Sequence, residues 1–249
     1  SGKLPLSWPR RYRDAPTSLS FPGEFGESVY GEGIFVGYRY YDTAGVDPLY
    51  PFGFGLSYTT FSIGNLRLSS PSFSLAGAET VTALVDVTNT GSRRGREVVQ
   101  LYVHDVQSTV RKARQELKGF AKVELAPGAT TTVTFSLDAA AFSHYDARLA
   151  RVRVEPGIFE IVVGGSSRDI AARATLRATG DNPYAFGLAT PIARLMRSSG
   201  ARAVLARHLP ASAMEDPALH DAVEYFPLTP FGRVWTTRLA RHLGGASGG

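Results

Sequence analysis

The chain has 249 residues, 43% of them hydrophobic and 20% charged, which excludes a disordered protein and allows a sizeable core. It has no cysteine, which excludes disulfides, thiolate metal sites and cysteine nucleophiles and favours a reducing compartment such as the cytoplasm. The net charge of +5 is spread over dispersed arginines without a recognition helix, and no apolar run approaches the roughly 20 residues that span a bilayer, so we expect neither nucleic acid nor membrane as a partner.

Residues 1–65 hold more than half of the aromatic side chains, ten of them between Tyr30 and Phe61 together with six glycines. Residues 3–8, KLPLSW, are interpreted as a short strand and the remainder as a long irregular stretch. Such a stretch is uncommon in a self-sufficient domain, so we expect it to cross a larger body and pack against it. The opening SGKLPLSWPRR has neither an initiator Met nor a signal-peptide core, which suggests missing upstream sequence.

Residues 66–178 show the two-residue periodicity of half-buried strands. Residues 80–91, TVTALVDVTNTG, alternate apolar and polar side chains and end in a turn. In residues 97–105 one face carries Val99, Leu101 and Val103, and the other carries Val98, Gln100, Tyr102 and His104. Further strands are expected in residues 116–125, 130–138, 150–156, 157–167 and 169–178, and Tyr102, Phe120, Phe135 and Phe159 are assigned to core positions. Seven or so strands without helices between them indicate a mainly β protein with an antiparallel sandwich.

Residues 179–249 change to helical spacing. Thr190-Pro191, Asp216-Pro217 and Thr229-Pro230 each place a capping side chain before a proline suited to the first helical turn. The apolar residues that follow recur every three or four positions. We therefore expect a tail of short amphipathic helices.

Catalytic motifs are absent or weak. The chain lacks a G-x-S-x-G elbow, a phosphate-binding glycine loop and an H-E-x-x-H motif. The five histidines, His104, His144, His208, His220 and His242, have no close metal-ligand spacing, so no metal and no other cofactor is expected.

Carboxylates could form a glycosidase pair, since such an enzyme needs only two of them across a sugar. The candidates are Glu24, Glu27, Glu32 and Asp42 among the aromatic residues, and Asp105, Glu116, Glu155 and Asp169 in turns or at strand ends. We interpret them as solvated or hydrogen-bonded turn acids. Asp42 is expected to have a structural ionic partner, with Arg39 three residues earlier.

The sequence of residues 1–178 resembles the C-terminal portion of a glycoside hydrolase family 3 β-glucosidase. The matching stretches include SGKLPLSWPR, FPGEFGESVYGEGIFVGYRYYD, PLYPFGFGLSYTTF, VDVTNTGSRRGREVVQLYV, QELKGFAKVELAPGATTTVTFSLD and EPGIFEIVVGGSSRDI, in family order. The resemblance implies that residues 1–65 are the end of an α/β sandwich domain and an interdomain linker. It implies a fibronectin type III-like domain in residues 66–178, followed by a helical extension in residues 179–249.

The resemblance also implies that the chain lacks the catalytic carboxylates. In the family the nucleophilic aspartate belongs to an N-terminal barrel, and the acid/base glutamate precedes the part seen here. No catalytic residue is therefore assigned, and we expect the chain alone to be inactive. One departure is Phe54, where the family motif P-F-G-H-G-L-S-Y has a histidine.

The aromatic rings of residues 30–61 are expected to pack one domain against another. As an alternative, some of them border the sugar pocket, and Phe35 and Tyr38 are the candidates. The preferred function is an accessory part of a retaining β-glucosidase that hydrolyses a β-glucoside or oligosaccharide, with its own upstream domains and a homodimer as partners. The alternatives are a carbohydrate- or protein-binding module and an independent small hydrolase that uses the carboxylates from Glu24 to Asp42.

Overall fold

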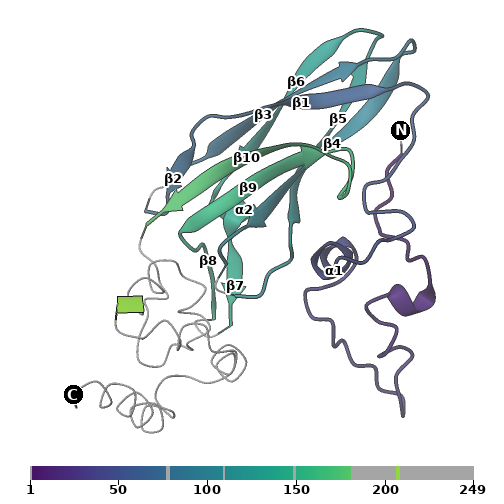
Figure 1. Ribbon diagram of the computed structural model, residues 1–249, viewed down its shortest axis with the longest axis vertical. Coiled ribbons are helices and arrows are strands. Elements are labelled where there is room, and N and C mark those ends of the chain that lie inside the picture. Colours follow the sequence, from purple (N-terminus) through teal and green to yellow (C-terminus); the bar gives the residue numbers. More distant parts are fainter. Residues whose placement is uncertain (1, 77–78, 109, 148–149, 181–205, 208–249) are drawn as a thin grey trace, which may run out of the picture. The chain divides into compact units, whose positions relative to one another are not determined.

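The structure is a computed structural model that describes residues 2–76, 79–108, 110–147, 150–180 and 206–207. The chain divides into two compact units, Ser1–Asn182 and Pro183–Gly249. Every named helix and strand belongs to the first unit (Figure 1). The helical tail expected in residues 179–249 falls almost entirely outside the described residues.

The first unit contains a sandwich of two β-sheets, which confirms the predicted mainly β fold (Figure 1). The three-stranded sheet has the order β1 (Phe61–Leu68), β3 (Val81–Asn89) and β6 (Thr130–Leu137). The five-stranded sheet has the order β2 (Ser72–Ser74), β10 (Ile170–Thr179), β9 (Gly157–Gly164), β4 (Gly95–Asp105) and β5 (Glu116–Leu125). The pairing is antiparallel except between β2 and β10, which run parallel.

The two-residue periodicity of the sequence fills the core between the sheets, as predicted. The core side chains of the three-stranded sheet are Val81, Ala83, Val85, Val87, Val133, Phe135 and Leu137. Those of the five-stranded sheet include Val99, Leu101, Val103, Phe159, Ile161, Val163 and Leu176. Because alternate residues of a strand point to opposite faces, each strand contributes its apolar set to this core.

Three small elements follow β6; α2 and β7 were not indicated by the sequence, whereas β8 lies within the strand expected in residues 150–156. Asp138 caps the four-residue helix α2 (Ala139–Phe142) by accepting hydrogen bonds from the backbone N–H groups of Ala140 and Ala141. The ring of Phe142 then packs between Phe73 and Phe159, with centroid distances of 4.7 and 5.2 Å. The strands β7 (His144–Asp146) and β8 (Arg151–Arg153) form a separate hairpin.

Phe120 is the core assignment that was wrong, because 70% of its surface is exposed. In β5 the neighbouring Gly119 faces the core instead, where an added Cβ would lie 2.8 Å from the ring of Phe135. The bulky ring of Phe135 thus occupies the space that a side chain at position 119 would need. Phe120 points to the outer face of the sheet.

Residues 2–60, which we call the aromatic segment, run along the outer face of the five-stranded sheet. The expected strand at residues 3–8 is absent; Trp8 forms only an isolated bridge with Tyr50. Pro5 and Pro9 explain this, since they have no N–H to offer a ladder. The segment instead contains the 3₁₀ turn η1 (Tyr12–Asp14) and the helix α1 (Tyr38–Ala44), which the sequence analysis missed.

Among the described residues, no helix has the length and apolarity needed to cross a membrane.

Candidate functional site: the aromatic segment and its seat on the sandwich

The outer face of β4 is a polar seat for the aromatic segment. Gln100 and Tyr102 share this face, as the alternation of residues 97–105 predicts, and both are buried. The Gln100 amide donates hydrogen bonds to the carbonyl oxygens of Gly53 and Gly165, at 3.3 and 2.7 Å, and accepts one from the Tyr102 hydroxyl. A Cβ on Gly53 would come within 2.1 Å of this amide, so the chain can pass here only as glycine.

Aromatic rings fill the space beside this seat. Tyr38, at the start of α1, stacks on Phe52 at a centroid distance of 4.7 Å and meets Tyr102 edge-on at 5.9 Å. The Tyr38 hydroxyl accepts a hydrogen bond of 2.8 Å from the backbone N–H of Leu117 in β5. Burial raises the pKa values of Tyr38 and Tyr102 above their ordinary values, so both hydroxyls stay protonated at neutral pH. These rings anchor the segment to the sandwich.

The buried carboxylate of Asp42 links α1 to two edges of the sandwich. It forms an ion pair with Arg168, from the turn between β9 and β10, and accepts a 3.1 Å hydrogen bond from the Gln115 amide. Burial raises the pKa of Asp42 above its ordinary value, although Arg168 and Gln115 act in the opposite direction. The expectation that Asp42 has an ionic partner is therefore correct. The nominated partner is wrong, because Arg39 pairs with Glu116 at 3.5 Å instead.

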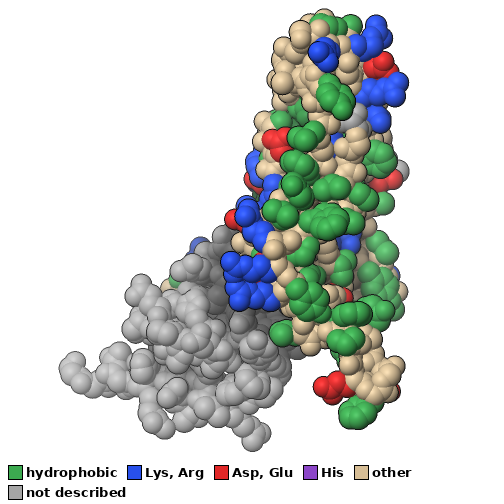
Figure 2. All heavy atoms as spheres, turned by 90° about the vertical axis from the view of Figure 1, so that its right-hand side faces the viewer, with side chains coloured by type: hydrophobic (Ala, Val, Ile, Leu, Met, Phe, Trp, Pro, Cys, Tyr) green, Lys and Arg blue, Asp and Glu red, His purple; other side chains and the backbone are tan. Residues whose placement is uncertain are grey.

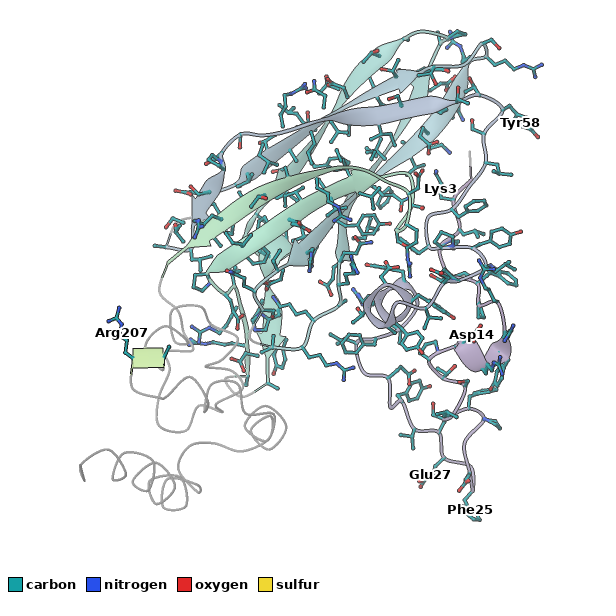
Figure 3. The ribbon with its side chains drawn as sticks, viewed as in Figure 1. Lys3, Asp14, Phe25, Glu27, Tyr58 and Arg207 are labelled. Carbon is teal, nitrogen blue, oxygen red and sulfur yellow. The ribbon has the colours of Figure 1, made fainter. Side chains whose placement is uncertain are left out.

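A second ion pair holds the start of the segment. Lys3 Nζ lies 2.6 Å from the Glu97 carboxylate of β4, and it donates a 3.0 Å hydrogen bond to the carbonyl of Gly165. Both side chains are largely buried, with 13% and 12% of their surfaces exposed. Figure 3 places Lys3 between the segment and the sheet. Polar contacts thus hold the segment at both ends of its seat.

The opposite side of the segment is apolar and open. Of the exposed large apolar side chains among the described residues, fourteen belong to the segment and four to the rest. The fourteen are Leu6, Trp8, Tyr12, Leu19, Phe21, Phe25, Val29, Tyr30, Ile34, Val36, Leu49, Tyr50, Leu56 and Tyr58. Figure 2 shows hydrophobic side chains along much of this face. We call these fourteen side chains the open face.

The tip of the segment projects farthest from the sandwich. Glu24 and Glu27 exchange backbone hydrogen bonds of 3.1 and 2.9 Å across a tight turn that carries the fully exposed ring of Phe25. Figure 3 shows Phe25 and Glu27 at this tip. A large apolar ring at the end of a projecting turn is a geometry suited to insertion into another surface.

The two proposed pocket residues have different surroundings. Tyr38 uses its ring and hydroxyl for the anchor described above. Phe35 is half-buried, and the guanidinium of Arg111 lies 4.4 Å above the centre of its ring. Phe54 packs against Tyr50 at a centroid distance of 5.1 Å.

Among the described residues, the other candidate histidines and carboxylates have charged neighbours, and His144 lies near Glu155 and Asp105. His104 lies 3.1 Å from Glu160, and burial lowers the pKa of His144 below its ordinary value. Glu116 binds Lys118, and its pKa is lower than usual because this cation and its neighbours outweigh the effect of burial. Within the described ranges, no three histidine or carboxylate side chains are grouped to hold a metal ion. His208, His220 and His242 lie outside those ranges.

Sequence reasoning missed the residues of the sandwich that bind the segment. Gln100, Gln115, Glu97 and Arg168 are ordinary polar residues of strands and turns in the sequence. Arg168 is 126 positions away from Asp42. A buried polar residue in the middle of an alternating strand, such as Gln100 in β4, was the one available signal.

Comparisons with known proteins agree with this architecture. The fibronectin type III-like domain family matches residues 97–167. The chain is 44% identical over 207 residues to the thermostable β-glucosidase B of Acetivibrio thermocellus, covering 82% of this chain and 27% of that protein. It is 45% identical over 181 residues to an exo-α-(1→6)-L-arabinopyranosidase of Bifidobacterium breve, covering 73% of this chain and 23% of that enzyme.

Solved structures of larger enzymes contain the same arrangement. A β-glucosidase of glycoside hydrolase family 3 from Bifidobacterium adolescentis matches with a TM-score of 0.70 and 38% identity, over 82% of this chain and 30% of that one. A β-glucosidase from Kluyveromyces marxianus, solved with glucose, matches with a TM-score of 0.66 and 40% identity, over 72% and 21%. The chain thus spans about a quarter of the length of the curated relatives it matches. Over most of its length the chain is similar to the C-terminal, fibronectin type III-like region of glycoside hydrolase family 3 β-glucosidases.

Proposed function

We propose that this chain is the accessory C-terminal part of a β-glucosidase-type glycoside hydrolase, and that its open face packs against the upstream catalytic domains of the same enzyme. The observation that carries the proposal is the two-sidedness of the aromatic segment. Polar contacts and the rings of Tyr38 and Phe52 bind it to the sandwich, whereas its fourteen open-face side chains are exposed. Soluble proteins rarely expose large contiguous apolar patches unless another surface covers them.

The division of the chain follows the same proposal. Residues 1–65 are the end of an α/β sandwich domain and a linker, residues 66–178 the fibronectin type III-like domain, and residues 179–249 a helical extension. The strand β1 spans Phe61–Leu68, so the last residues of the proposed linker already belong to a strand of the sandwich. This continuity supports a linker that is packed along its whole length.

The reaction of the complete enzyme is the retaining hydrolysis of a β-glucoside or a β-linked oligosaccharide. Its nucleophile and its acid/base residue lie outside this chain, which is inactive alone. The surroundings of Asp42 support this assignment. Its carboxylate is buried, forms an ion pair with Arg168 and accepts a hydrogen bond from Gln115, so a sugar has no access to it. Phe35 remains the better pocket-border candidate, since the ring of Tyr38 is committed to Phe52 and Tyr102.

The relatives suggest that this region does not choose the sugar. A β-glucosidase and an arabinopyranosidase match the chain equally well, at 44% and 45% identity. Enzymes named for two different sugars therefore have a region similar to this chain. We infer that the region supports the active site without determining its specificity.

The alternative is a carbohydrate-binding module, which binds sugars on several neighbouring exposed rings of one sheet face. The described strands expose the large rings of Phe120 in β5 and Tyr145 in β7, which belong to different sheets. Phe120 lies directly opposite Gln100, beside the segment, so it extends the open face. This arrangement favours the accessory role.

A region swap tests the proposal. In β-glucosidase B and in the arabinopyranosidase, the part that this chain matches is replaced by residues 1–249, and hydrolysis of chromogenic β-glucoside and α-arabinopyranoside substrates is measured. We expect each chimera to be active and to keep the sugar preference of its host. If both chimeras preferred the same sugar, the proposal would be contradicted, because residues 1–249 would then determine the substrate specificity.

A further inference from the structure

The guanidinium of Arg168 gathers four acceptors from the aromatic segment. Its Nε donates to the carboxylate of Asp42, and one terminal nitrogen lies 3.3 Å from the carboxylate of Asp47. The other terminal nitrogen donates to the carbonyl oxygens of Tyr41 and Val46, at 2.9 and 3.1 Å. All of these acceptors belong to the C-terminal part of α1 and the turn that follows it.

The turn that carries Arg168 is itself well fixed. Ser166 Oγ accepts hydrogen bonds from the backbone N–H groups of Arg168 and Asp169, and the N–H of Gly165 donates to the carbonyl of Asp169. The N–H of Ser167 donates to the carbonyl of Phe52 at 2.9 Å. A side chain held on such a turn has little freedom to follow a moving partner.

The helix α1, in contrast, has little to stabilise it from within. It has seven residues, Gly37 at its N-cap makes no side-chain capping bond, and its last turn has no basic residue. Helices this short are marginal in isolation. Arg168 supplies from outside the cation that the C-terminal end of a helix favours, and it donates further hydrogen bonds to carbonyl groups at that end.

We propose that Arg168 is a positioning residue: it fixes α1 on the sandwich and so sets the orientation in which the open face meets the catalytic domains. The effect on the partner rests on the proposed function, whereas the fixing of α1 does not. Ile34 and Val36 immediately precede α1, and Leu49 and Tyr50 follow its turn, so open-face residues flank the fixed point on both sides.

Backbone hydrogen bonds around α1, two of them from β5 and the residues just before it, show where release of the helix would be measured. The N–H of Arg114 donates to Thr43 Oγ1 at 2.9 Å, and the N–H of Leu117 donates to the Tyr38 hydroxyl at 2.8 Å. The N–H of Val46 donates to the carbonyl of Tyr41 at 3.1 Å. If Arg168 holds α1, these three amide hydrogens become more open to solvent when its guanidinium is removed.

Amide hydrogen exchange of the full chain tests the fixing of α1. We expect Arg168→Met to speed exchange at Val46, Arg114 and Leu117 by about tenfold, the scale of losing hydrogen bonds to a charged group, while β3 and β9 exchange at the wild-type rate. The control is Arg173→Met, which removes an exposed arginine of β10 that lies 3.4 Å from Glu160. Unchanged exchange at the three amides, or equal acceleration throughout the sandwich, would overturn the proposal.

A second arm measures the partner. Wild type, Arg168→Met and Arg168→Lys are titrated into β-glucosidase B lacking the part that this chain matches, and hydrolysis of a chromogenic β-glucoside is followed. We expect Arg168→Met to raise the chain concentration that gives half-maximal activity about tenfold, without lowering the activity at saturation. Arg168→Lys should restore part of the affinity, because lysine keeps the positive charge but lacks the planar guanidinium with its several N–H donors. Equal titration curves for all three chains would overturn the positioning role.

The two arms separate the two ideas. If the wild-type chain restores no activity, the proposed function fails, and the exchange experiment still decides whether Arg168 fixes α1. If the wild-type chain restores activity and Arg168→Met lowers only the saturating activity, the arginine acts on catalysis rather than on docking, and the positioning proposal is wrong.

Discussion

The sandwich buries its large apolar side chains in its own core, whereas the aromatic segment leaves many of its large apolar side chains exposed to solvent. In the sandwich, strands such as β3 and β9 turn valine, isoleucine and phenylalanine inward and fully bury them. The segment turns Lys3, Asp42 and Gly53 toward the sandwich and leaves rings such as Tyr58, at 95% exposure, in solvent. The exposed apolar side chains of the segment are the ones that the proposed function covers with another domain.

This difference separates what holds each region in place. The sandwich is stabilised by burial of apolar area, which is large and tolerant of small shifts. The segment is held by the ring contacts of Tyr38 and by a few hydrogen-bonded and charged contacts. The polar contacts are directional, and they lose most of their stabilising effect when one partner is removed. The account therefore predicts that core changes unfold the sandwich, contact changes release the segment, and open-face changes leave stability intact.

The largest expected effect comes from the core. Phe159 is 1% exposed and contacts Phe142, so Phe159→Ala should lower the free energy of unfolding by about 3–5 kcal/mol. Urea unfolding followed by far-ultraviolet circular dichroism measures this. The matched variant Phe120→Ala removes the same side chain from an exposed site and should change stability by less than about 0.5 kcal/mol. Similar losses in both variants would mean that Phe120 is covered in solution.

A smaller effect is expected where the segment meets the sheet. Gln100→Ala leaves the Tyr102 hydroxyl and the carbonyls of Gly53 and Gly165 without this partner, at a cost of about 1–3 kcal/mol. Chymotrypsin should then cut within residues 49–58 faster than in wild type, while the sandwich stays resistant. Cleavage that begins within β3 or β9 would show that the two regions do not open separately.

The open face should contribute little to the stability of the free chain. Tyr30→Ser with Tyr58→Ser should leave the unfolding free energy within about 0.5 kcal/mol of wild type, because both rings are mostly exposed. The same double variant should bind less of a fluorescent hydrophobic dye and associate less at high concentration. If stability fell by several kcal/mol, the rings would be packed on the chain itself, contrary to the comparison.

The smallest effect concerns the uncovered face of the three-stranded sheet. Arg67, Asn65 and Thr132 all donate hydrogen bonds to Asp86 and lower the pKa of its carboxyl well below the ordinary value. Since the folded pKa is the lower one, this stabilisation is present above the unfolded pKa of about 3.9 and is lost as the pH falls below it.

The check is the urea midpoint at pH 6 and pH 3. Wild type should exceed Asp86→Asn at pH 6, and the difference should shrink at pH 3. The difference should be small because Asp86 and Arg67 are near the surface. A constant or growing difference at pH 3 would contradict the assignment.

The sequence predicted the sandwich well because its strands are locally consistent. In β3 every apolar residue of the alternation is buried, and the turn after Asn89 falls where Thr90 and Gly91 indicate it. The error at Phe120 arose because ring size was taken as a sign of burial. The ring of Phe135 in β6 packs over Gly119 in β5, which belongs to the other sheet. A contact between two sheets cannot be seen in the local sequence pattern of either strand.

The seat of the segment could not be predicted in the same way. Helix α1 lacks the capping signals that mark a helix start, and its stabilising arginine is 126 positions away in the sequence. The nearest opposite charge, Arg39, was therefore chosen for Asp42, although Arg39 points to Glu116. Polar contacts between residues far apart in the sequence leave no repeating sequence pattern from which they could be predicted.

The most direct test of the central claim is hydrolysis of a chromogenic β-glucoside by three samples. These are the full chain, β-glucosidase B without the part that the chain matches, and the two mixed. The account predicts no activity from the chain, little from the truncated enzyme and restored activity in the mixture. Activity of the chain alone, or a truncated enzyme that is fully active without it, would contradict an accessory role.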